Sequence, residues 1–272
     1  RVFDGGRPLR DHHDRHIFRL RPQRAAQRRI GGVVQSRGGI IQNQDIRLLR
    51  QQMNVVSSLP KDYVFLNYLR CHDDIGWGLD YPWLRQFGID EVSHKKYLND
   101  FLTGQYPGSF GRGELYNSDP ESGDARLCGT TASLCGIEKA AFEKDAEALE
   151  KAVRLDLMLH AYMLSQSGIP VIYSGDEIGQ ENDYTYHENP RKWDDSRYLH
   201  RGDFLWNLEK KRSVKGSLQE KIFDGIKKLE TIRAQYPVFC TDAQVRTIDT
   251  WDDSILGLVR EYGEEKVIAK WK

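Results

Sequence analysis

The chain has 272 residues, which is enough for one large domain or for one medium and one small domain. Its 40 basic and 40 acidic residues balance, so the overall charge predicts neither a nucleic-acid nor an anionic-membrane partner. No apolar run approaches the roughly 18 residues of a membrane span, and no secretory signal pattern opens the chain, which favours a cytoplasmic location.

Residues 1–43 differ in composition from the rest of the chain. They hold ten arginines against three aspartates, with no sustained apolar period. One interpretation is a basic arm for nucleic acid or a membrane surface. Residues 1–60 contain twelve arginines and no lysine, whereas residues 61–272 contain twelve arginines and sixteen lysines. Because this change is abrupt, we favour a foreign or frame-shifted segment, and we expect residues 1–43 to be disordered or poorly packed.

From residue 44 onward the pattern is that of a folded protein. A helix is predicted to end near Met53, because Ile46, Leu49 and Met53 share one face. The aromatic-rich apolar run over residues 63–70 then predicts a buried strand. Directly after this strand come His72, Asp73 and Asp74, so the strand delivers ionisable side chains at its C-terminal end. In parallel α/β architectures that edge of the sheet carries the chemistry.

Residues 75–142 are rich in glycine, aromatic and turn residues, which is typical of a functional loop or an inserted subdomain. A short helix is predicted near residues 95–102. The longest helical period covers residues 142–166, and an apolar strand over residues 169–173 follows and ends at Asp176 and Glu177. This order of strand, excursion, helix and strand predicts a βαβ unit in a parallel sheet.

The C-terminal part of the chain changes period. A polar loop over residues 175–207 precedes a helix predicted for residues 218–236. Antiparallel strands are then predicted near residues 244–249, 254–261 and 266–269. The sequence therefore predicts an α/β part over residues 44–236, followed by an antiparallel β domain over residues 237–272 that we expect to be truncated. The four cysteines lack Cys-x-x-Cys spacing, so no zinc site or disulfide framework is predicted.

Several motifs along the chain resemble one family. Residues 65–77 look like the seventh-strand motif of the α-amylase superfamily, glycoside hydrolase family 13, and residues 168–177 look like its eighth-strand motif. The doubled Asp73-Asp74 is similar to the amylosucrase and sucrose hydrolase branch, as are residues 108–113, 122–126 and 194–197. The resemblance covers about residues 44–269. It implies the last two βα units of a partial (β/α)8 TIM barrel, with residues 75–142 inserted after strand seven.

The resemblance also implies a sugar-binding site. Retaining members of the family use a carboxylate nucleophile, a carboxylic acid and a third carboxylate. The resemblance gives Asp73 the role of the third carboxylate, with His72 beside it as a partner for sugar hydroxyls. Asp74 is expected at the fructosyl or acceptor ring, because neighbouring side chains at a strand end point in different directions. The alternative for Asp74 is a carboxylate that caps the turn.

Three basic residues complete the expected substrate contacts. The resemblance assigns Arg126 to the acceptor subsite, where its guanidinium can donate to two sugar oxygens; the alternative is a loop arginine paired with Asp124. Arg197 matches an arginine that closes the glucosyl pocket through an ion pair with an upstream aspartate. We expect that aspartate to be absent here, which leaves Arg197 unpaired. Lys95 is expected at an outer acceptor position.

The family's nucleophile, general-acid and early Asp-x-x-x-Asn-His motifs are not found in the sequence. We therefore expect a C-terminal fragment of an amylosucrase-like glycosidase or glucosyltransferase acting on sucrose or α-glucans, inactive alone, without a metal or other cofactor. One alternative is a fragment of a starch or oligosaccharide α-glucosidase. Another is a non-catalytic carbohydrate-binding or scaffold homologue. The oligomeric state is left open.

Overall fold

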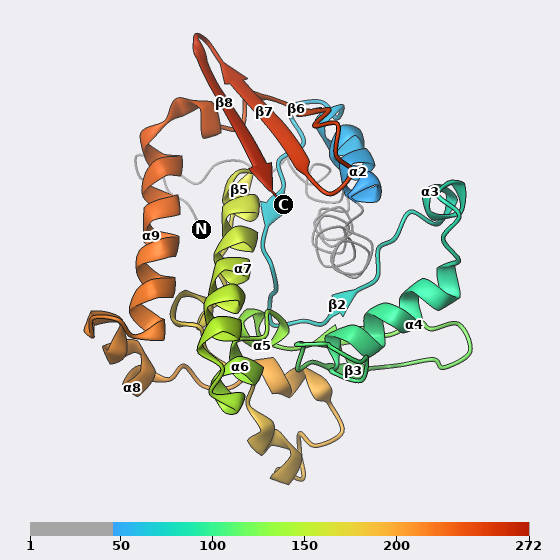
Figure 1. Ribbon diagram of the computed structural model, residues 1–272, viewed down its shortest axis with the longest axis vertical. Coiled ribbons are helices and arrows are strands. Elements are labelled where there is room, and N and C mark those ends of the chain that lie inside the picture. The colour runs from blue at the N-terminus through green and yellow to red at the C-terminus, as the bar shows by residue number, and fades with distance from the viewer. Residues whose placement is uncertain (1–45, 272) are drawn as a thin grey trace, which may run out of the picture.

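The computed structural model describes residues 46–271, so the disorder predicted for residues 1–43 lies outside the described residues (Figure 1). The α-helices are α2 (Arg47–Ser57), α3 (Tyr81–Gln86), α4 (Glu91–Leu102), α5 (Thr131–Leu134), α6 (Ile137–Glu143), α7 (Ala146–Leu164), α8 (Trp206–Glu209) and α9 (Leu218–Gln235). The 3-10 helices are η2 (Asp176–Ile178), η3 (Tyr184–Glu188), η4 (Ser196–His200), η5 (Lys210–Ser213) and η6 (Pro237–Phe239). The strands are β1 (Leu66–Asn67), β2 (Ile75–Gly76), β3 (Glu114–Tyr116), β4 (Arg126–Cys128), β5 (Ile169–Pro170), β6 (Gln244–Ile248), β7 (Leu256–Tyr262) and β8 (Glu265–Trp271).

The two apolar runs found in the sequence form a parallel pair, as the βαβ pattern predicted. In β1 and β5, Leu66 pairs with Ile169, and the Ile169 amide donates to the Phe65 carbonyl over 2.8 Å. The regular part of each strand is only two residues long, shorter than predicted. The strands are short because regular strand structure needs hydrogen-bonded neighbours, and within residues 46–271 β1 and β5 pair only with each other.

Gly168 allows the chain to pass directly from α7 into β5. Its φ angle is +112°, a backbone conformation that side-chain-bearing residues rarely adopt. A Cβ atom at this position would also lie 2.2 Å from the Phe65 carbonyl oxygen. Glycine therefore permits both the turn and the close approach of the two strands.

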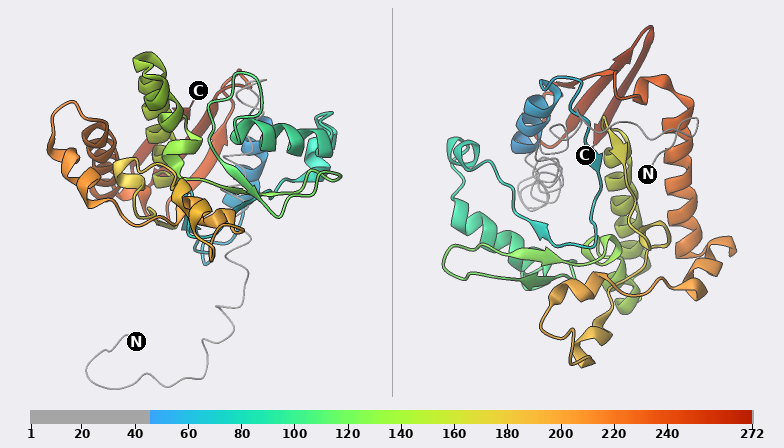
Figure 2. Two further views of the ribbon diagram at one scale, coloured as in Figure 1. Left: turned by 90° about the horizontal axis from the view of Figure 1, so that it is seen from below. Right: turned by 180° about the vertical axis from the view of Figure 1, so that it is seen from behind.

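Helices α7 and α9 lie side by side and cover one face of the parallel pair (Figures 1 and 2). Their shared core contains Val153, Ile222 and Ile226, and Ile172 packs against it from the segment after β5. Among residues 46–271, little covers the opposite face of the pair: Leu66 is 45% exposed and Ile169 is 54% exposed. The predicted burial of these strands is therefore correct for one face and wrong for the other.

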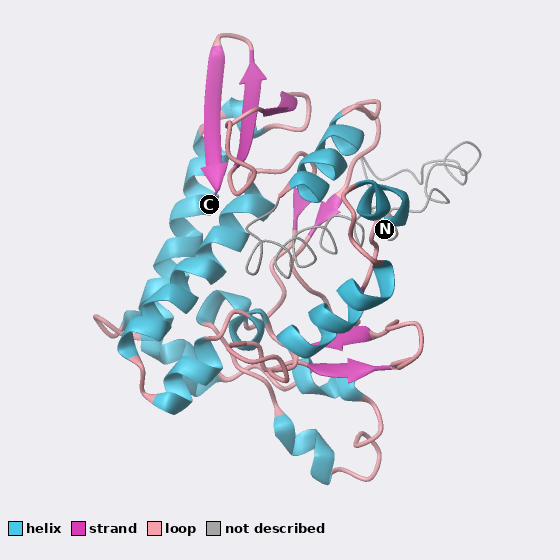
Figure 3. Ribbon diagram, turned by 45° about the vertical axis from the view of Figure 1, so that its right-hand side comes forward, coloured by secondary structure: helices cyan, strands magenta, loops and turns pink. Residues whose placement is uncertain are grey.

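Part of residues 75–142 packs around a core of its own, whereas Ala132 and Ile137 join the core shared by α7 and α9. Strands β2, β4 and β3 make an antiparallel sheet in that order, and α4 packs on it through Leu98, Phe101 and Leu102. Figure 3 shows this sheet apart from the other two sheets. The helix predicted near residues 95–102 is present and begins earlier, at Glu91, because the Asp90 side chain caps it by accepting from the Ser93 amide.

The C-terminal strands β6, β7 and β8 form an antiparallel meander, as the sequence predicted. Leu256 and Leu258 of β7 share a core with Met53 of α2 and Leu159 of α7. Residues 46–271 are thus a mixed α/β fold with a C-terminal antiparallel sheet. The helices within this range are all too short or too polar to span a bilayer.

Candidate active site

Side chains that are far apart in the sequence meet just beyond the C-terminal end of β1. Asp73 lies 3.4 Å from Arg197, measured from Oδ1 to Nη1, although 124 residues separate them in the sequence. Arg201 approaches the same oxygen with its Nη2 at 3.6 Å. We call Asp73, Asp195, Arg197 and Arg201 the Asp73 cluster. Two carboxylates and two guanidinium groups balance its charge.

Arg197 is firmly paired, so the expectation that it would lack a partner is wrong. Its Nε and Nη2 atoms each donate to an oxygen of Asp195 over 2.8 Å, which is the bidentate geometry of strong arginine pairs. These hydrogen bonds lower the pKa of Asp195. Asp195 also caps η4 by accepting from the Arg197 amide. The partner comes from the local Asp-x-Arg segment instead of an upstream region.

Arg201 is a member of the cluster that the sequence reasoning missed. Its Nε donates to the main-chain carbonyl of His72, and its guanidinium lies 5.4 Å from the ring centre of Tyr198. It follows Arg197 by four residues in the same polar segment. Arg201 stands one residue past the end of η4, so its approach to Asp73 depends on the folded loop and not on a helical repeat.

The predicted acceptor residues Asp74 and Arg126 also lie close together. Arg126 Nε is 3.8 Å from Asp74 Oδ1, and Gly76 of β2 pairs with Arg126 of β4. Burial raises the pKa of Asp74, and the Arg126 charge opposes that shift. Arg126 is not paired with Asp124, the alternative partner considered from the sequence, since Asp124 binds Lys95. The Arg126 side chain is 52% exposed and can turn toward a ligand.

Lys95, expected at an outer acceptor position, is buried and lies in a network of ion pairs. Its side chain is only 3% exposed, and its ammonium group lies 2.7 Å from both Glu91 and Asp124. It also lies 4.7 Å from the ring centre of Tyr81. An ammonium group shared by two carboxylates is less available to a sugar, so this geometry argues against the expected contact.

A buried ion pair lies behind the exposed cluster. Arg70 Nε donates to Asp176 Oδ1 over 2.7 Å, and the two side chains are 3% and 2% exposed. His72 lies on the surface next to this layer, and its carbonyl group accepts from Arg201. The sequence reasoning missed Arg70, although an arginine inside an apolar strand signals a paired, buried charge.

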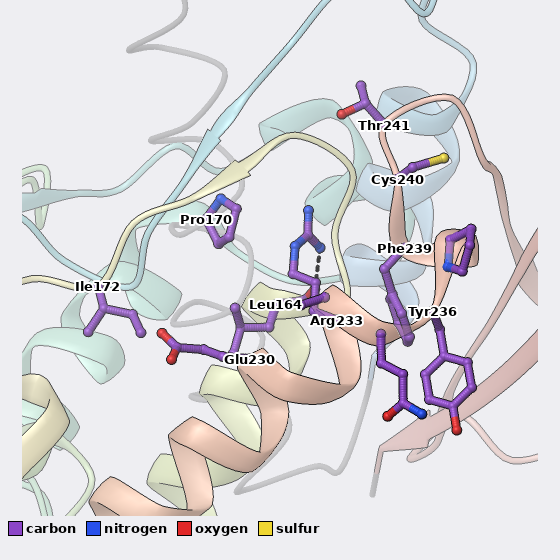
Figure 4. Close-up of a pocket in the computed structure, with 12 residues that line it drawn as sticks. Leu164, Pro170, Ile172, Glu230, Arg233, Tyr236, Phe239, Cys240 and Thr241 are labelled. Carbon is purple, nitrogen blue, oxygen red and sulfur yellow. Dashed lines mark hydrogen bonds between the residues drawn. The ribbon is translucent and has the colours of Figure 1, made fainter.

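The cluster forms an open surface, because the Asp73 side chain is 49% exposed. A hollow next to it measures only about 10 Å³ and is lined by Tyr68, Leu69, Arg70, Cys71, Asp74, Ile75 and Gly76. A larger pocket of about 570 Å³ lies between α9, β5 and η6 (Figure 4). Arg233 in that pocket donates to carbonyls at the end of α7 and in the segment that leads to β5, including Gly168 at 2.7 Å. None of the four cluster residues lines it.

No family model matches the chain. Among solved structures, a sucrose 6F-phosphate phosphorylase from Thermoanaerobacter thermosaccharolyticum aligns with a TM-score of 0.58 and 15% identity, over 92% of this chain and 42% of that one. A cyclic alpha-maltosyl-(1→6)-maltose hydrolase from Arthrobacter globiformis aligns with a TM-score of 0.48 and 17% identity, over 90% of this chain and 35% of that one. The likeness to the phosphorylase shows a shared fold. The chain spans less than half the length of both structures.

Proposed function

We propose that this chain contributes one wall of the sugar site in an α-amylase-superfamily enzyme that acts on sucrose or α-glucans. In this proposal β1 and β5 are the seventh and eighth strands of a (β/α)8 barrel, and residues 75–142 are the inserted subdomain that shapes the pocket. The observation that carries the proposal is the 3.4 Å contact between Asp73 and Arg197 at the C-terminal end of the parallel pair.

Asp73 and His72 would act at the glucosyl ring. A carboxylate that accepts from sugar hydroxyls stabilises the ring as it flattens toward the oxocarbenium-like transition state. Arg197, held by Asp195, would close the same subsite. Asp74 and Arg126 would contact the fructosyl or acceptor ring, which their proximity of 3.8 Å supports. Lys95 is not part of this assignment.

The resemblance assigns the nucleophile and the general acid to motifs that this sequence does not contain, so the chain alone would bind sugar without cleaving it. The branch of the superfamily is part of the proposal. In an enzyme that contains this chain, polymer formation with fructose release from sucrose would support the amylosucrase-like branch. Maltose release from maltodextrin, without any action on sucrose, would support an α-glucosidase instead.

Binding to the chain itself tests the site. Sucrose and maltose are titrated into the protein, and amide shifts are followed by NMR. We expect binding of about millimolar strength, because one open wall offers only part of a full site. Asp73→Asn and Arg197→Lys should each weaken binding about tenfold. Asp62→Asn, a change at an exposed carboxylate, is the matched control. Equal affinity in all four proteins would refute the proposed site.

A further inference from the structure

Arg70 connects three segments of the chain from a buried position. Its Nε donates to Asp176 Oδ1 over 2.7 Å, and its Nη1 donates to the His200 carbonyl over 3.2 Å. Its guanidinium also lies 4.5 Å from the ring centre of Tyr173. One side chain at the end of β1 therefore holds both the segment after β5 and the end of η4.

The exposed ligand-facing residues are attached to these same segments. Asp73 follows Arg70 by three residues, and Arg201 directly follows His200. Arg197 lies within η4, whose last residue is His200. The separation of Asp73 from the two guanidinium groups is thus set by the elements that Arg70 joins, while Arg70 itself is only 3% exposed.

We propose that Arg70 and Asp176 are positioning residues, which hold Asp73 and the two guanidinium groups at the spacing needed for a sugar without contacting the sugar themselves. This inference rests on the proposed function. A buried ion pair is weak evidence for added stability, because desolvation offsets much of its attraction. Its value here is directional: a guanidinium donates along fixed angles, so the pair fixes orientation where an apolar contact would let the segments slide.

Cys71 reports on this spacing without any sugar. Its Sγ accepts from the Asp73 amide over 3.3 Å, and burial raises the pKa of its thiol, so alkylation should be slow. Cys240, a second half-buried thiol, lies in the segment before β6 and serves as the internal reference. Both rates are measured by mass spectrometry of peptides after timed exposure to iodoacetamide.

The test variant is the double substitution Arg70→Met with Asp176→Leu. It replaces both buried charges with apolar side chains, a replacement that stable folds often tolerate. We expect alkylation of Cys71 to become about fivefold faster while the rate at Cys240 stays unchanged, because only the strand end loosens. An unchanged rate at Cys71 would overturn the inference, and so would an equal rise at both thiols, which would reveal a purely structural role.

Sugar titration completes the test. The double variant should lose about tenfold in affinity relative to the unmodified protein. Arg70→Lys keeps one charge toward Asp176 but not the fork to His200, and it should give smaller changes in the same direction at Cys71 and in affinity. This second variant decides the matter if the double variant does not fold. If the unmodified protein binds no sugar, the proposed function fails, and the thiol rates still decide whether the pair positions the strand end.

Discussion

His200 should make the protein sensitive to mild acid. Its side chain is buried, and its Nδ1 accepts from the Gly129 amide over 3.0 Å. Burial lowers the pKa of His200 from 6.5 to about 4, and the nearby Arg70 charge adds to the shift. The folded state therefore holds the neutral ring, and protonation would remove the acceptor that Gly129 uses.

The sign and size follow from this shift. Because the folded-state pKa is the lower one, the stability from His200 is fully present above pH 6.5 and is lost as pH falls from 6.5 to about 4. With a pKa of 6.5 in the unfolded state and about 4 in the folded state, protonation of His200 lowers the free energy of unfolding by about 2 kcal/mol at pH 5 and about 3 kcal/mol at pH 4.

Urea unfolding at pH 7 and pH 5 measures the effect. The matched variant is His200→Asn, whose amide oxygen can still accept from Gly129 but does not titrate. Comparing the change in unfolding free energy between the two proteins cancels the contributions of all other titrating groups. The unmodified protein should lose about 2 kcal/mol more than the variant between the two pH values. An equal loss in both proteins would refute the reasoning.

Two further predictions concern His160 and Lys95. Burial disfavours the charge of His160, but the Asp156 carboxylate 3.0 Å away raises its pKa to about 9. The free energy of unfolding contributed by this pair is fully present below pH 6.5 and should fall as pH rises to about 9. Urea unfolding at pH 7 and pH 9.5 measures this fall. An equal change in stability in His160→Gln would contradict the prediction. Lys95→Met should lower the melting temperature and leave sugar affinity unchanged, because Glu91 and Asp124 occupy the ammonium group; weaker sugar binding at unchanged stability would restore the outer-subsite role.

Periodicity predicted the helices and the C-terminal sheet well. The shared face of Ile46, Leu49 and Met53 is buried, and the apolar faces predicted for α7 and α9 pack against each other. The boundary before α7 was missed. Helix α6 ends at Glu143, because Lys144 adopts a left-handed conformation. Phe142 therefore belongs to α6 and not to α7, and its side chain is 85% exposed. A local backbone break of this kind leaves no signal in the apolar period.

The ion pairs were predicted less well, because they depend on which loops meet in space. The meeting of Asp73 and Arg197 came from the resemblance and not from any local pattern. The sequence could not show that Asp195 would hold Arg197 or that Asp124 would bind Lys95 instead of Arg126. Several carboxylates lie at similar sequence distances from each basic residue, and the folded backbone determines which of them becomes its partner. The roles of the site residues toward a sugar stay predictions.

The bare face of the parallel pair has a consequence for how this polypeptide behaves in a cell. Val64, Leu66, Ile169 and Val171 are between 40% and 54% exposed, and they adjoin strand edges. Exposed apolar side chains at strand edges bind chaperones and promote aggregation when a protein is overexpressed. Yield and solubility would therefore depend on what covers these four side chains, and a single lysine in place of Leu66 would improve both.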